Sequence, residues 1–152
     1  MFGMDFIFDE IPHKLIPFDY DAFFASPIEF WVGATDVETG KPVYFSKDAI
    51  VKDSLVLRAS SAIPVFSPMV EIDDKKYLDG GTSDPIPVRK ALADGCDRVI
   101  LVLTRDRSYR KTPEKYHAVY RRMYHDYPYM IETIDHRHKI YNETLEYIRE
   151  LE

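Results

Sequence analysis

The stretch from Lys75 to Thr104 constrains the fold most, because two strand patterns flank one helix pattern there. "KYLD" forms the returning arm of a predicted hairpin that turns near Asp73 and Asp74. "SDPIPVRKALADG" predicts a helix with Asp84 near its N-cap, prolines in the first turn and Gly95 as terminator. "RVILVLT" is an unbroken apolar run, which is typical of a strand buried on both faces. This order predicts a layered α/β fold with a partly parallel sheet.

The patterns before this stretch extend the α/β interpretation. "FDYDAFFAS" predicts a short helix with Asp19 or Asp21 near its start. "EFWVGATDV" and "PVYFS" predict a hairpin whose turn carries Gly40. "KDAIVKDSLVLRASSA" has helical spacing and must end before Pro64, because proline lacks a donor and restricts its predecessor.

The carboxyl-terminal third reads as helical and rich in charge. Residues 113–151 predict two helices broken near Pro128. We therefore expect two parts, an α/β part at residues 1–104 and a helical extension at residues 105–152 that is tyrosine-rich and basic at its start.

Composition excludes several classes of protein. The 152 residues are 45% hydrophobic and 30% charged, as in ordinary globular domains, which excludes disordered and fibrous chains. No apolar run approaches the length of a membrane span, and the first thirty residues lack a signal-peptide pattern. Cys96 is the single cysteine of the sequence, which suits a reducing compartment, and we expect it to be a small buried hydrophobe. These features predict a cytoplasmic protein.

Charge is distributed unevenly. The net charge of −6 argues against a nucleic-acid binder. Residues 98–122 nevertheless hold eight basic side chains against two acidic ones, with tyrosines at helical spacing. This segment either docks peripherally on a membrane or partner, or packs its tyrosines and keeps its charges solvated, and we favour the second interpretation. Its members are Arg98, Arg105, Arg107, Arg110, Lys111, Lys115, Arg121 and Arg122, with Tyr116, Tyr120, Tyr124 and Tyr127.

Asp79, Gly80 and Gly81 form the candidate site. An acid at a strand end followed by two residues without side chains is held rigidly and leaves room for substrate. A carboxylate whose pKa is raised by its surroundings can take the proton from a serine hydroxyl without a histidine. The same sequence is also an ordinary turn signal, so the motif alone leaves both interpretations open.

The segments "ATDVETGKPVYF" and "LRASSAIPVFSPMVEIDDKKYLDGGTSDPIPVRKALADGCDRVILV" resemble the second half of patatin-like phospholipases, in their bacterial branch. The ordered set A-S-S-A-I-P, D-G-G and D-x-I-P carries the resemblance, which covers residues 25–104. It implies a partial three-layer α/β/α fold, with a mixed sheet containing a buried parallel strand, followed by C-terminal helices. It also implies a serine acyl hydrolase with a Ser-Asp dyad, in which Asp79 is the acid and Gly80 and Gly81 are the motif glycines.

The sequence departs from that family pattern at the nucleophile. No G-x-S-x-G is present, and Ser83 has Pro85 where the second glycine belongs. We therefore expect a fragment of an acyl-ester hydrolase whose serine and oxyanion loop lie upstream of Met1, inactive by itself. A non-catalytic membrane- or partner-binding domain derived from the same fold is the alternative. Expected partners are a lipid or other acyl ester and a second copy of the chain, with no nucleic acid and no metal or organic cofactor.

Other chemical candidates are weaker. Asp135, His136 and His138 with Glu132 allow a metal site to be imagined, but alternate residues share a face on a strand and not on a helix. Surface histidines are therefore the favoured interpretation. Ser60 and Ser61 lack a nucleophile elbow and are expected to close the preceding helix.

Overall fold

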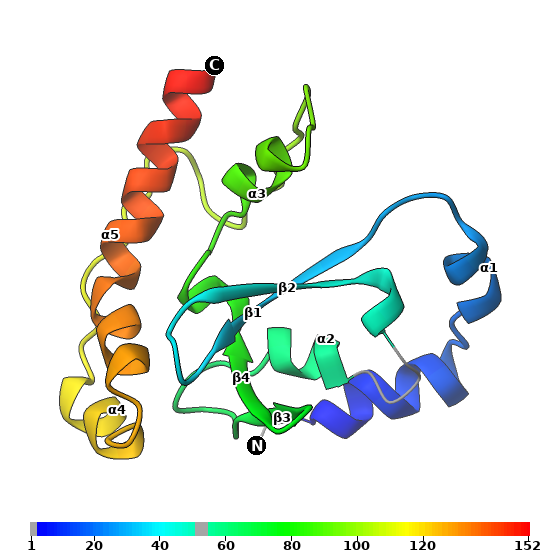
Figure 1. Ribbon diagram of the computed structural model, residues 1–152, viewed down its shortest axis with the longest axis horizontal. Helices are drawn as coiled ribbons and strands as arrows, with labels where there is room; N and C mark the ends of the chain where they lie inside the picture. Colours follow the sequence, from blue (N-terminus) through cyan, green and yellow to red (C-terminus); the bar gives the residue numbers. More distant parts are fainter. Residues whose placement is uncertain (1–2, 51–54) are drawn as a thin grey trace.

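A computed structural model describes residues 3–50 and 55–152, and its elements follow the predicted α/β order except for the strand expected at residues 98–104 (Figure 1). The strands are β1 (Trp31–Asp36), β2 (Pro42–Ser46), β3 (Val70–Ile72) and β4 (Lys75–Asp79). The α-helices are α1 (Tyr20–Ala25), α2 (Leu55–Ser60), α3 (Val88–Ala93), α4 (His117–Met123) and α5 (Pro128–Leu151). The remaining helical turns are a π-helix, η1 (Phe6–Leu15), and two 3-10 turns, η2 (Lys47–Ala49) and η3 (Gly80–Thr82).

Two hairpins build the sheet, and both were predicted. The strand order is β2-β1-β4-β3, and every pair is antiparallel. Gly40 turns the first hairpin with a φ of 67°, while Asp73 and Asp74 turn the second with φ values of 50° and 60°. Short polar residues tolerate this left-handed region better than most side chains do. Pairing of β1 with β4 then joins the two hairpins.

Helices cover both faces of the sheet, as Figure 1 shows. Successive residues of a strand point to opposite faces, so Tyr77 and Leu78 separate the two layers. Tyr77 packs in a cluster with Ala59 of α2, whereas Leu78 packs with Met130 and Ile134 of α5. The α/β class is therefore confirmed.

The helical extension packs against the sheet. Tyr120 and Tyr124 are buried in the same cluster as Leu78, and the predicted break near Pro128 separates α4 from α5. Thr133 of α5 donates a 2.8 Å hydrogen bond to the carbonyl oxygen of Gly40, which fixes the first hairpin turn on the helix. Long side chains of the extension thus supply much of the core on this face.

The expected buried parallel strand in "RVILVLT" is wrong for this structure. Residues 99–103 have no strand assignment, and Ile100 and Val102 are 92% and 91% exposed. A parallel strand needs parallel neighbours on which to bond and pack, and all four described strands pair antiparallel. Cys96, expected to be buried, is also exposed.

The helix predicted after the D-G-G motif begins later than expected. α3 starts at Val88, so the prolines precede it, and Pro87 occupies the N-cap position without a capping side chain. Asp84 instead accepts a hydrogen bond from the Tyr44 hydroxyl. Gly95 follows the helix with a φ of 91°, as expected of a terminator.

Candidate active site

Asp79 is the last residue of β4 and is held by backbone contacts on both sides. It lies opposite Ala34 of β1 in the sheet register. Its amide donates a 2.9 Å hydrogen bond to the carbonyl oxygen of Ala62. The structure thus brings the A-S-S-A-I-P segment alongside the D-G-G motif, although fourteen residues, 65–78, separate them in the sequence. The backbone that carries the carboxylate is therefore fixed.

The two glycines are required by space. A Cβ atom on Gly80 would lie 2.4 Å from the carbonyl oxygen of Gly33, a backbone atom that cannot move aside cheaply. A Cβ atom on Gly81 would lie 2.9 Å from Oδ1 of Asp79. The absence of side chains here lets the chain turn sharply into η3 while keeping the carboxylate clear.

The environment of Asp79 favours the protonated form of its carboxyl group. Burial raises the pKa of Asp79 above its ordinary value, while the charge of Arg137 and hydrogen bonding from the Gly81 backbone oppose that shift. A carboxylate with a raised pKa is a stronger base than an ordinary aspartate.

Two hydroxyl groups lie next to the motif, and only that of Thr35 bonds to it directly. The Thr35 hydroxyl donates a 2.8 Å hydrogen bond to the carbonyl oxygen of Asp79 and lies 2.8 Å from Oγ of Ser83. Because Thr35 has one hydroxyl hydrogen, Ser83 is the donor in the second contact. Both residues are buried. The contact of Thr35 with Asp79 depends on the pairing of β1 with β4, which local sequence patterns do not reveal.

Arg137 of α5 also reaches the motif. Its Nε donates a 2.8 Å hydrogen bond to the carbonyl oxygen of Gly81, and its Nη1 lies 3.8 Å from the Glu114 carboxylate. No pattern in the sequence links this arginine to a glycine on a distant turn. The helical extension therefore contributes directly to the surroundings of Asp79.

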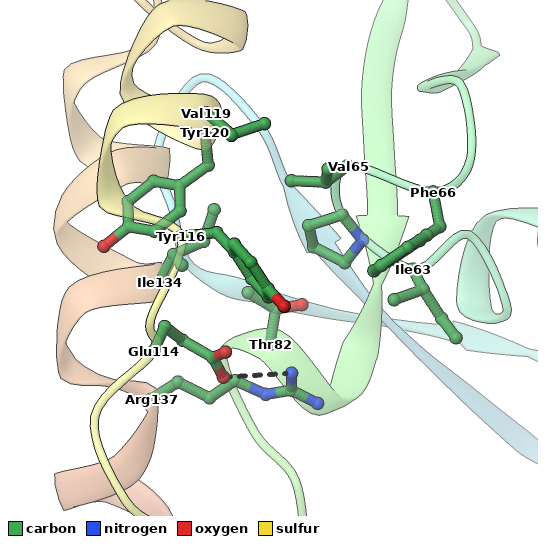
Figure 2. Close-up of a pocket in the computed structure, with 11 residues that line it drawn as sticks. Ile63, Val65, Phe66, Thr82, Glu114, Tyr116, Val119, Tyr120, Ile134 and Arg137 are labelled. Atoms are coloured by element: carbon green, nitrogen blue, oxygen red, sulfur yellow. Dashed lines mark ion pairs between the residues drawn. The ribbon is translucent and has the colours of Figure 1, made fainter.

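Two cavities meet residues of this turn. The larger, which we call the extension pocket, has a volume of about 340 Å³ and lies between the loop after α2 and the extension (Figure 2). Apolar side chains dominate its lining, and Thr82, Glu114 and Arg137 are the polar members. The smaller cavity, of about 170 Å³, is lined by Gly80, Gly81 and Ser60 among others.

The other candidates from the sequence, the histidine cluster and the two serines after Ala59, do not form a site within the described residues. No group of three His, Cys, Asp or Glu residues able to hold a metal ion occurs in ranges 3–50 and 55–152. His136 is exposed and His138 is half-buried on α5. Ser60 ends α2, and the amide of Ser61 bonds back to the Leu57 carbonyl, so both close the helix as expected.

The basic segment uses much of its charge internally. Four of its members form ion pairs with acids of the chain: Arg107, Arg110, Lys111 and Arg121. Tyr120 and Tyr124 are buried, whereas Tyr116 is exposed. None of the helices in the described part of the chain is long and apolar enough to cross a bilayer.

Residues 8–92, more than half of the chain, match the family model for patatin-like phospholipases. The chain belongs to this family. The patatin-like match includes the D-G-G motif and ends before the helical extension that carries Arg137.

Three curated relatives are named as uncharacterised proteins. The chain is 42% identical to Escherichia coli protein YjjU over 60 residues, which are 39% of this chain and 17% of YjjU. It is 34% identical over 76 residues to the NTE family proteins Mb1092c of Mycobacterium bovis and Rv1063c of Mycobacterium tuberculosis, covering 50% of this chain and 20% of each relative. The chain thus spans about a fifth of the length of these relatives or less. No solved structure matches it.

Proposed function

We propose that Asp79 is the general base of a Ser-Asp dyad in a lipid acyl hydrolase. The observation that carries the proposal is the half-buried carboxylate at the end of β4, whose backbone is fixed and whose pKa is raised by burial. Membership of the patatin-like family supports the same assignment.

In this mechanism the nucleophile comes from a part of the protein outside the present residues. That serine attacks the ester carbonyl while Asp79 takes its proton, and backbone amides stabilise the oxyanion. Asp79 passes this proton to the ester oxygen that departs, so the alcohol leaves and the carboxylate is regenerated, and Asp79 then takes a proton from the water that releases the acyl group as an acid. We place the approach of the serine on the side of the smaller cavity, which Gly80 and Gly81 line without side chains.

Asp79→Asn in the intact protein tests the assignment. Asparagine keeps the size and the turn preference of aspartate but cannot accept the proton, so kcat/KM for a lipid ester should fall about 100-fold or more. Thermal unfolding, followed by circular dichroism, should show that the variant still folds. Unchanged turnover by this variant would mean that D-G-G is only a turn.

Ser83→Ala provides the matched control. Ser83 lies beside the motif but donates its hydroxyl hydrogen toward Thr35, so we expect turnover to change by less than about threefold. An enzyme that tolerates Asp79→Asn but loses activity with Ser83→Ala would overturn the dyad assignment.

A further inference from the structure

The extension pocket has the size and lining of a site for one apolar chain. Its volume of about 340 Å³ lies at the low end of the roughly 300–1,000 Å³ typical of ligand pockets. The volume therefore fits a single acyl chain better than the two chains of a diacyl lipid. Its apolar walls are formed by Ile63, Val65, Phe66, Tyr116, Val119 and Ile134.

The polar groups gather at one end of this pocket. Figure 2 shows the ion pair of Glu114 and Arg137 at the end away from Val65 and Val119. Arg137 also holds the carbonyl of Gly81, so this polar end adjoins the D-G-G turn. An acyl chain lying along the walls would therefore present its ester toward the turn.

Thr82 adds a hydrogen-bonding group without a partner. Its side chain is fully buried and lines the pocket, and its hydroxyl has no hydrogen-bond partner among residues 3–50 and 55–152. A buried hydroxyl without a partner is unfavourable, and an ester oxygen can accept its hydrogen.

The charges at the polar end are already balanced. Arg137 lies near both Glu114 and Asp79, and Lys111 forms a 3.2 Å ion pair with Glu114. A carboxylate buried here would find no cation without an acidic partner, and an unpaired buried charge is strongly disfavoured. A neutral ester needs only the hydrogen bond.

We propose that the extension pocket binds the single acyl chain of a neutral ester, and that Glu114 selects against the free carboxylate. The catalytic meaning of this selection rests on the proposed function, since hydrolysis adds water to the ester and yields an alcohol and a carboxylic acid that ionises. The pocket would thus hold the substrate and release the charged product.

Calorimetric binding of methyl octanoate and octanoate to the 152-residue chain tests the proposal without turnover. The ester should bind at least about tenfold tighter than the carboxylate. Val119→Trp fills the pocket from a partly exposed position and should abolish binding of both probes. Val102→Trp, on an exposed segment outside the pocket, should leave both affinities unchanged.

Two further variants separate the polar contributions. Glu114→Gln leaves a cation available, so octanoate affinity should rise and the preference for the ester should fall below about threefold. Glu146→Gln, which removes an acid paired with Arg110 and Arg149 elsewhere, should keep the preference. Thr82→Val should weaken the ester about three- to tenfold.

Equal binding of the two probes, or ester binding that survives Val119→Trp, would overturn the inference. So would an ester preference that Glu114→Gln leaves intact, or ester affinity that Thr82→Val does not change. Because these measurements need no chemistry, they stand apart from the Asp79→Asn test. The binding measurements can therefore fail while the Asp79→Asn test succeeds, and the reverse, so the two failures are distinguishable.

Discussion

At the scale of residues, the D-G-G motif has two properties: a partly buried carboxylate, and a glycine packed closely against the backbone of a neighbouring strand. Asp79 carries a carboxylate that burial disfavours in its charged form, and Gly80 leaves no room for a side chain. The first property suits the proton transfer proposed above and costs stability. The close packing of Gly80 against the Gly33 backbone fixes the chain next to the carboxylate. Each makes a separate prediction about unfolding.

Asp79→Asn should stabilise the chain at neutral pH. The folded-state pKa of Asp79 is raised, so its contribution to stability is fully present below the ordinary pKa of about 4 and is lost as pH rises through the folded value. Asparagine stays neutral, so the variant should have the higher melting temperature at neutral pH. The difference should vanish in acid, in thermal melts recorded across pH.

Gly80→Ala should destabilise the chain by about 1–3 kcal/mol, because its Cβ would overlap the backbone of Gly33. Gly33→Ala is the matched control, since a Cβ there meets only the Tyr44 ring at 3.6 Å. That variant should be neutral or stabilising by about 0.4–1 kcal/mol. Urea unfolding of both variants measures the difference, and equal midpoints would contradict the steric argument.

At the scale of elements, α5 lies outside the residues that match the family and yet contacts two parts of the matched region. It lies beside the sheet in Figure 1, buries Met130 and Ile134 against Leu78, and carries Arg137 to the D-G-G turn. Met130→Ala should therefore cost about 2–5 kcal/mol of unfolding free energy, as measured in denaturant. Met123→Ala, at a partly exposed position of α4, should cost far less.

The sequence predicted elements wherever the local chemistry was sufficient. Both hairpins, the helix started by Asp19 and the break near Pro128 follow from turn, cap and proline preferences. The strand expected at residues 98–104 failed, because an apolar run specifies burial but not the neighbour that supplies it. The sequence analysis did not identify Thr35 and Arg137 as neighbours of the motif for a related reason, since their contacts to it depend on tertiary structure.

At the scale of the whole molecule, an apolar segment lies uncovered. Val99, Ile100 and Val102 are exposed, and large exposed apolar patches favour association. We expect the chain to form dimers or larger species in light scattering. Joint substitution Ile100→Lys and Val102→Lys should shift it toward monomer, while a clean monomer of the unmodified chain at high concentration would contradict the expectation.

The chain by itself should not hydrolyse short-chain nitrophenyl esters. It carries the proposed base but neither a G-x-S-x-G elbow nor a glycine-rich oxyanion loop. The hydrolysis rate should equal that of buffer in an absorbance assay. Turnover that disappears with Asp79→Asn would reveal a nucleophile within these residues.

The contact between Gly40 and α5 has a consequence for genetics. Thr133 and Arg137 are one helical turn apart. They donate hydrogen bonds to the carbonyl oxygens of Gly40 and Gly81, respectively. A Cβ on Gly40 would lie 2.4 Å from Oγ1 of Thr133 and would sit at a positive φ. Any such allele would displace the helix whose Arg137 bonds to the carbonyl oxygen of Gly81. Under the proposed function, a screen for inactive alleles should therefore recover substitutions of Gly40 together with those of Asp79, although Gly40 lines neither cavity beside the motif.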